Sequence, residues 1–233
     1  MLKRLGLSAL LLSSAIAAAP AFAADLTVGT PQPNYGNCWP FSCGASDGLG
    51  WYQEIYNGSA FTSAVRISGA SFTEAFSRNG TNSIDSASYD ISFYLSSKNT
   101  ATITGDRAGN QSQLLADWGT FTIGGALTGG KLSFSGQSFV YDPSMGSLLM
   151  DVTVHDATHT VGENTFFQED AGTGSIARIV GDDTGGYGPY NQALVTTFNA
   201  GAVPEPASWA LMLGGFGLVG SAMRRRAAKV AFA

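Results

Sequence analysis

The sequence is poor in charge and contains very little cysteine. Of its 233 residues, 12% are charged and two are cysteines, whereas 11% are aromatic. Chains that stay disordered have the opposite composition, with much charge and few aromatic residues, so we expect the body of this chain to fold. Its 30 glycines, together with abundant serine and threonine, favour many short strands joined by turns over long helices.

Basic residues are scarce between residues 24 and 202. Two of the twelve basic residues precede this region and four follow it, which leaves six, whereas sixteen of the seventeen acidic residues lie within it. The body therefore carries a formal charge near −10, which repels phosphate backbones and argues against binding to nucleic acid. Solubility is the simplest interpretation of this charge, and cation binding is the alternative.

The familiar signatures of catalysis are scarce. One Gly-x-Ser-x-Gly sequence occurs at residues 44–48, but in hydrolases this motif lies on a turn from a strand into a helix, and the body shows no helical periodicity. The chain has no phosphate loop of the form Gly-x-x-x-x-Gly-Lys-Ser/Thr. Two cysteines are too few for a structural zinc site, and they lack the Cys-x-x-Cys spacing of redox proteins. We therefore predict no catalytic residues, no metal site and no cofactor, and we do not expect an enzyme. Paired carboxylates that cleave glycosidic bonds leave no sequence signature, because their pairing is spatial.

The N-terminus has the order of a secretory signal peptide. Lys3 and Arg4 precede the apolar run Leu5–Ala19, and the small-x-small sequence Ala21-Phe22-Ala23 follows. Basic start, short apolar run and cleavage site together predict a signal peptide over residues 1–23. Signal peptidase would cut between Ala23 and Ala24, so the exported body would comprise residues 24–202.

The C-terminal residues 203–233 have the reverse order, with an apolar run before a basic cluster. An apolar, glycine-containing run from Trp209 to Met223 lies between Val203-Pro204-Glu205-Pro206 and the basic cluster Arg224-Arg225-Arg226. Such a run is at the short limit for a spanning helix, with the tryptophan at one interface and the arginines on the cytoplasmic side. The two prolines cannot continue a helix, so they mark an extended segment outside the membrane.

This tail resembles the PEP-CTERM sorting signal of Gram-negative bacteria. The matching residues are Pro204, Glu205, Pro206, Trp209, Arg224, Arg225 and Arg226. The resemblance implies a substrate of an exosortase, a transpeptidase-like membrane enzyme that cuts near Pro-Glu-Pro, and an association with exopolysaccharide and biofilm material. The protein would cross the inner membrane transiently through its tail and then reach the cell surface or the extracellular matrix. One departure is the extension Ala227–Ala233 after the arginines.

Alternation of apolar and polar residues dominates the body. A period of two residues is typical of strands with one buried face, and turn signals such as Asn57-Gly58, Gly124-Gly125 and Asp142-Pro143 separate the strands. We predict an all-β fold, an antiparallel β-sandwich of the jelly-roll type, with Ile91, Phe93, Met150 and Val152 inside. The strand candidates are 65–67, 89–96, 121–123, 132–134, 150–155 and 194–198. The segments 51–56 and 139–152 are also similar to small exported proteins of the PEP-CTERM group, for which no activity is established.

Few residues of the body are candidates for chemistry. We expect Cys38 and Cys43 to form a disulfide, because they are the only cysteine pair in an exported chain. His155 and His159 have a spacing that suits a metal on a helix, but they lie at a strand end and in a loop, so we read them as exposed histidines. The acidic, glycine-rich stretches 169–172 and 181–186 could offer oxygen ligands to calcium, but solvated turns explain them more simply.

Three hypotheses for the function follow from the sequence. The first is a surface or biofilm-matrix protein with a structural or adhesive role. The second is a carbohydrate-binding module for exopolysaccharide, in which Trp39, Trp51 and Trp118 would form a stacking platform unless they belong to the core. The third is a secreted hydrolase, which would need two carboxylates facing each other in a cleft.

Overall fold

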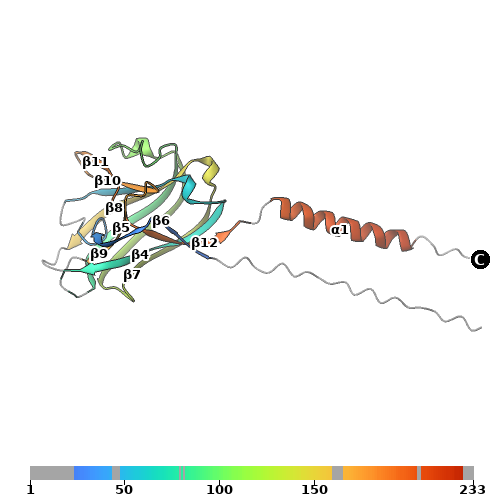
Figure 1. Cartoon of the computed structure of the whole chain (residues 1–233), viewed down its shortest axis with the longest axis horizontal. Helices are drawn as coiled ribbons and strands as arrows, with labels where there is room; N and C mark the ends of the chain where they lie inside the picture. The colour runs from blue at the N-terminus through green and yellow to red at the C-terminus, as the bar shows by residue number, and fades with distance from the viewer. Residues whose placement is uncertain are drawn as a thin grey trace, which may run out of the picture.

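A computed structural model of the chain describes residues 24–43, 48–78, 80, 82–158, 165–203 and 206–227. Two packed β-sheets form the body, and one helix, α1 (Pro206–Ala227), stands apart from them (Figure 1). The paired strands are antiparallel throughout. The predicted all-β sandwich is therefore confirmed. The predicted signal peptide, residues 1–23, lies outside the described residues.

The first sheet is built around one long strand, β4 (Val65–Ser77). The other strands of this sheet are β1 (Ala24–Val28), β2 (Pro31–Asn37), β7 (Lys131–Tyr141), β9 (Thr165–Asp170) and β12 (Thr196–Ala202). β7, β9 and β12 pair with β4 itself, whereas β1 pairs with β12 and β2 with β9. Residues 65–72 of β4 pair with both β12 and β7, which must therefore lie on opposite edges of the strand. Residues 74–77 pair with β9 instead, so this one strand links two parts of the sheet.

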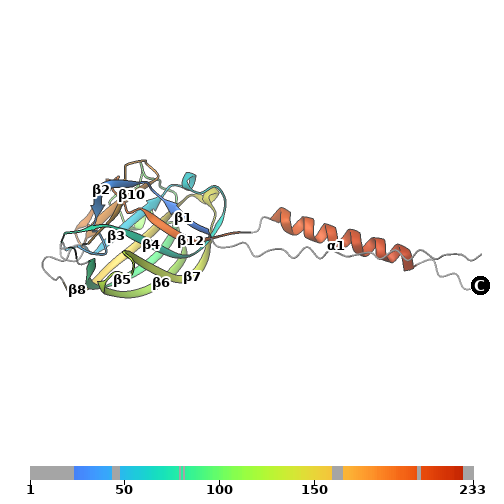
Figure 2. The ribbon, with the colours of Figure 1, turned by 60° about the horizontal axis from the view of Figure 1, so that its bottom comes forward.

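The second sheet has the strand order β11-β10-β3-β8-β5-β6. Its strands are β3 (Trp51–Tyr56), β5 (Ser83–Ser96), β6 (Gln113–Ala126), β8 (Ser147–Thr158), β10 (Ile176–Asp182) and β11 (Gly185–Tyr190). Three short 3-10 helices, η1 (Gly58–Ala60), η2 (Ala108–Asn110) and η3 (Pro143–Met145), lie in the connections. Figure 2 shows β6 and β7 neighbouring each other where the chain passes from this sheet to the first.

Aromatic side chains fill the space between the sheets. Ile91, Phe93, Met150 and Val152 are all buried, as the alternation predicts. The rings that are in contact in this core are Phe41, Tyr56, Phe61, Phe72, Tyr89, Phe93, Trp118, Phe121, Phe134, Phe139, Tyr141, Phe167 and Phe198. Burying side chains of this size is the main source of stability in a sandwich of this kind.

The outer face of the second sheet is also partly covered. Ile103, from the connection between β5 and β6, packs in a second apolar cluster with Trp51, Ile55 and Leu149. Because β3 is covered on both faces, all six of its residues are buried. The alternation in β8 turns Asp151 away from the core formed by Met150 and Val152, but the covering connection leaves Asp151 only 5% exposed.

One predicted turn is part of a strand. Gly124 and Gly125 lie within β6, where the register with β5 shifts between Ile84 and Ala87. Gly125 has a φ of +82°, a conformation that glycine adopts without steric cost. The two glycines therefore form an irregularity in a continuous strand rather than its end.

Both ends of the sandwich lie at one pole. β1 begins at Ala24, whose register partner on β12 is Ala200, and β12 ends at Ala202, which pairs with Val65. Figures 1 and 2 show β12 ending on the side from which the chain continues to α1. Among the described residues, no helix is both long and apolar enough to span a membrane. The transient crossing expected of Trp209–Met223 therefore stays a prediction.

Candidate functional site

A polar groove of about 360 Å³ lies on the second sheet. Strands β5, β6 and β8 and the connection between β5 and β6 form its walls. Its lining residues are Asp90, Ser92, Tyr94, Arg107, Gln111, Asp117, Gly119, Thr120, Asp151 and Thr153. The groove therefore combines carboxylates, hydroxyls, an amide and a guanidinium within one concavity.

Asp151 forms the floor of the groove and is held from several sides. The Gln53 amide donates to its Oδ2 at 2.6 Å, and the Gln111 amide donates to the same oxygen at 2.9 Å. Arg107 donates through Nε at 3.1 Å to Oδ2 and through Nη2 to Oδ1. Asn110, which is fully buried, donates to Gln53 Oε1 at 2.8 Å and so fixes the amide behind the floor.

Arg107 is held in its place by contacts other than the ion pair. Its Nη2 also donates to Thr153 Oγ1 at 2.6 Å, and its guanidinium carbon lies 5.5 Å from the centre of the Trp51 ring. The side chain is 31% exposed, whereas that of Asp151 is 6% exposed. The fork of the guanidinium thus lies between a buried carboxylate and the open groove.

The rim of the groove carries two further carboxylates. Asp90 accepts hydrogen bonds from Thr120 Oγ1 at 2.5 Å and pairs with His155 Nε2 at 2.7 Å. These partners, Thr120 first, lower the pKa of Asp90 below its ordinary value. Asp117 accepts from the Gly119 amide at 2.9 Å and from Ser92 Oγ at 3.3 Å.

The charge of the groove is negative. Its lining carries three carboxylates against one guanidinium, a formal charge of −2. The carboxylates are spread along the groove rather than gathered: within the described residues, no three His, Cys, Asp or Glu side chains are placed to hold a metal ion. The site suits a ligand that forms many separate hydrogen bonds.

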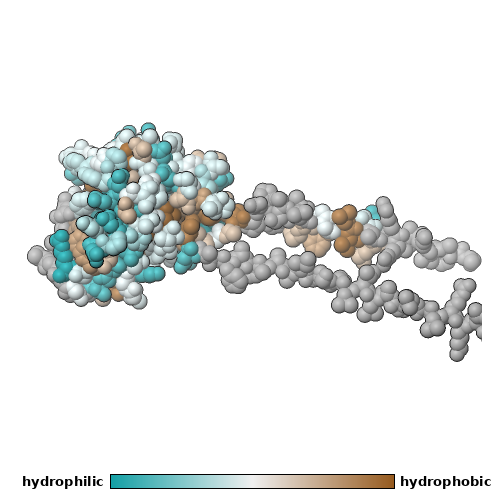
Figure 3. Space-filling view, viewed as in Figure 1, coloured by the Kyte–Doolittle hydropathy of each residue, from teal (hydrophilic) through white to brown (hydrophobic). Residues whose placement is uncertain are grey.

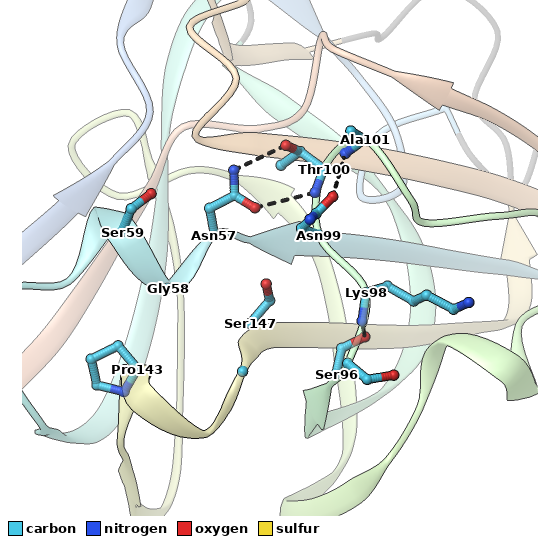
Figure 4. A pocket seen from close by; sticks show the side chains of 12 residues that line it. Asn57, Gly58, Ser59, Ser96, Lys98, Asn99, Thr100, Ala101, Pro143 and Ser147 are labelled. Carbon is cyan, nitrogen blue, oxygen red and sulfur yellow. Dashed lines mark hydrogen bonds between the residues drawn. The ribbon is translucent and has the colours of Figure 1, made fainter.

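A second, larger pocket of about 540 Å³ lies near η1 and η3 (Figure 4). Asn57 joins its two sides, because its amide nitrogen donates to Thr100 Oγ1 at 3.0 Å and its oxygen accepts from the Thr100 backbone N–H at 3.2 Å. Asn99 accepts from the Ala101 N–H in the same loop at 3.0 Å. Lys98 is the one charged residue in the lining, so this pocket offers less chemistry than the polar groove.

A buried carboxylate lies between the sheets, away from the groove. Glu54 accepts hydrogen bonds from the Leu194 N–H at 2.9 Å, from Thr196 Oγ1 at 3.0 Å and from the Tyr52 hydroxyl. Burial raises the pKa of Glu54 from 4.5 to about 7. Arg178, also buried, is the nearby cation, and its guanidinium lies over a tryptophan ring, that of Trp39, at 4.8 Å. Full burial makes this group a structural element rather than a binding one.

The cysteines, histidines and acidic stretches that the sequence singled out lie in different surroundings. Cys38 and Cys43 are bonded, as predicted. His155 is exposed near the end of β8 and pairs with Asp90, whereas His159 lies outside the described residues. Of the acidic stretches, Asp182 accepts from the Thr184 N–H at 2.7 Å and closes the turn between β10 and β11.

Asp170, in the other acidic stretch, is fully buried. It accepts hydrogen bonds from the Thr30 N–H at 2.7 Å and from the Thr173 N–H at 2.9 Å. Its carboxylate therefore holds two segments of backbone together.

The tryptophans do not form a stacking platform. Trp51 and Trp118 are 7% and 9% exposed and belong to the two apolar clusters, and Trp39 is partly buried against Arg178. Larger exposed fractions occur at Tyr35 and Tyr187. The interpretation of the tryptophans as core residues is therefore the correct one for Trp51 and Trp118.

The residues that build the groove were missed by the sequence analysis, except as members of strands. Arg107 and Gln111 lie in a connection without periodicity, and only the tertiary structure brings them to β8. One signal was present: Gln53 is a polar residue inside the otherwise apolar face Trp51, Gln53, Ile55 of a strand. A buried amide of this kind must find hydrogen-bond partners, which points to a polar network nearby.

The predicted sorting residues fall at the end of the described chain. Trp209 and the three arginines lie within α1, whereas Pro204 and Glu205 lie outside the described residues. Pro206 was expected in an extended segment but is the first residue of α1, a position where a proline costs no helical hydrogen bond. The model of the PEP-CTERM protein-sorting motif matches residues 202–226. No curated protein shows a significant match to the chain, and neither does any solved structure.

Proposed function

Because the chain carries a PEP-CTERM sorting motif and is an exported exosortase substrate, we propose that it acts at the cell surface or in the biofilm matrix in a structural or adhesive role. The proposal assigns the sandwich no catalytic step. Exopolysaccharide is the proposed surrounding of the mature domain, and signal peptidase and exosortase are its proposed processing partners.

The position of the motif carries this proposal. The match begins at Ala202, which is also the last residue of β12. One residue, Val203, separates the sheet from Pro204. Cleavage near Pro204–Pro206 would thus release a complete sandwich and leave almost no linker.

The exposed apolar side chains of α1 indicate that lipid or another protein covers the tail in the cell. Leu213, Phe216 and Leu218 are 68%, 71% and 74% exposed, and Figure 3 shows hydrophobic residues along the helix. An apolar helix surface of this kind is covered in the cell by lipid or by protein. In our proposal the inner membrane and the exosortase cover it until the chain is cut, and Arg224–Arg226 stay on the cytoplasmic side. Moving arginine into the bilayer costs about 2.5–3.5 kcal/mol per residue.

Two variants of the tail test the proposal. Replacing Pro204, Glu205 and Pro206 by Ala should leave uncleaved protein in the inner membrane. Replacing Arg224, Arg225 and Arg226 by Ser should let the tail slip through, so that uncut protein leaves the membrane fraction. Lys229→Ser, beyond the matched motif, is the control and should be sorted like the wild type.

The measurement is the intact mass of the protein in inner-membrane, surface and medium fractions. If both variants reach the surface with the wild-type mature mass, the sorting tail has no role. For the adhesive role, deletion of the chain should weaken the cohesion of the biofilm, and the Pro204–Pro206 variant should not restore it.

A further inference from the structure

We propose that the polar groove binds an uncharged saccharide through Asp90, Asp117, Thr153 and Arg107. This assignment goes beyond surface display, which would hold without it. The groove has a volume of about 360 Å³, at the lower end of ordinary ligand pockets, which suits a short stretch of a saccharide chain.

The chemistry of the lining fits a row of hydroxyl groups. Each sugar hydroxyl both donates and accepts, so it needs acceptors and donors close to each other. Asp90 and Asp117 supply acceptors on the rim, Arg107 and Gln111 supply donors, and Thr153 supplies a group that does both. Each carboxylate oxygen accepts more than one hydrogen bond, so the contacts within the protein leave capacity for a ligand.

The floor of the groove is built as a preorganised site. Burying the Arg107–Asp151 pair removes charge from water, and such pairs contribute little net stability compared with apolar residues of the same volume. Here the buried carboxylate is held by two amides and a guanidinium, and a fully buried asparagine fixes one of the amides. Rigid second contacts of this type hold binding groups at fixed positions and reduce the entropy lost on binding.

The charge of the groove selects among saccharides. With three carboxylates against one guanidinium, the lining repels a uronate or another acidic sugar. The surrounding body, with a formal charge near −10 from sixteen acidic and six basic residues, adds to this repulsion. An uncharged polysaccharide meets no such barrier.

The test compares two oligosaccharides of equal length. The full-length chain, purified in mild detergent, is titrated with a neutral gluco-hexasaccharide and with hexagalacturonate, and binding is followed by calorimetry and by NMR shifts of backbone amides. The neutral sugar should bind saturably and shift amides of β5, β6 and β8. Hexagalacturonate should bind at least tenfold more weakly at low salt.

Two double variants locate the site. Asp90→Ala with Asp117→Ala should weaken neutral binding at least tenfold. Asp90→Asn with Asp117→Asn keeps the shape and removes two charges, so it should bring the acidic sugar to within a few fold of the neutral one. Asp183→Ala, at an exposed turn outside the groove, should bind like the wild type, and circular dichroism should show all variants folded.

Three results would overturn the proposal. The first is an absence of saturable binding to the neutral sugar, and the second is wild-type affinity in the folded Asp90→Ala, Asp117→Ala variant. The third is release of shorter sugars during the titration, which would make the groove a hydrolytic site. A further result, equal binding of both sugars, would leave saccharide binding in place but overturn the restriction to uncharged saccharides. None of these results depends on sorting, so failure here and failure of surface display are distinguishable.

Discussion

The rings of Phe41 and Phe72 lie 5.0 Å apart in the centre of the sandwich. Phe41 is fully buried and lies in the loop closed by Cys38 and Cys43, whereas Phe72 belongs to β4. Phe41 also contacts Tyr89 of the second sheet at 5.3 Å. The loop closed by the disulfide therefore places the Phe41 ring in the core, where it contacts both sheets.

Removing this disulfide should loosen the packing of Phe41 in the core. We expect Cys38→Ser with Cys43→Ser to lower the free energy of unfolding by roughly 2 kcal/mol, the loop-closure term for about six residues. Urea unfolding of both proteins measures the difference. Intact mass before and after reduction and alkylation provides the control, and two free thiols in the native protein would contradict the bond.

The buried carboxyl of Glu54 should make stability depend on pH. Its pKa is about 7 in the fold against 4.5 ordinarily, so the folded state binds the proton more tightly. The stability that the protonated carboxyl contributes to the fold is complete below about pH 4.5 and is lost as the pH rises through about 7. The wild type should lose about 3 kcal/mol over this window relative to Glu54→Gln, which cannot titrate.

Urea unfolding at pH 4.5 and at pH 7.5 gives the free energy of unfolding of each protein at the two ends of this window. Asp183→Asn, an exposed carboxylate remote from Glu54 in sequence, should keep the wild-type pH dependence. Parallel curves for the wild type and Glu54→Gln would show that the carboxyl titrates at its ordinary value.

The mature protein should begin at Ala24. Ala21-Phe22-Ala23 supplies the small residues that signal peptidase reads, and the first strand of the sandwich starts at the next residue. N-terminal sequencing of the exported fraction measures this start. Ala21→Arg should hold the precursor in the cell, and an exported chain that still begins with Met1 would refute the cleavage site.

The agreement between sequence and structure depends on how local each signal is. The alternation in β5 and β8 predicted the burial of Ile91, Phe93, Met150 and Val152, because a strand turns successive side chains to opposite faces whatever surrounds it. The tail was readable for the same reason, since prolines, apolar run and arginines act in linear order. The match of residues 202–226 to the sorting motif confirmed that interpretation.

The burial of Asp151 was not readable, because it depends on what lies over the strand. Arg107 reaches it from 44 residues away along the chain, and the connection that carries Arg107 has no periodic pattern. Trp51 was ambiguous for the same reason: a covered outer face and an exposed one produce the same alternation.

The sequence by itself determined that the body is a β-sandwich and that the tail is a sorting signal, since both follow from patterns between neighbouring residues. Only the tertiary structure decided that Asp90, Asp117 and Asp151 share a groove and that Phe41 plugs the core. Asp90 and Asp151 are 61 residues apart in the sequence and lie on the paired strands β5 and β8. Such pairings arise from strand register and loop packing, which the order of residues along one segment does not contain.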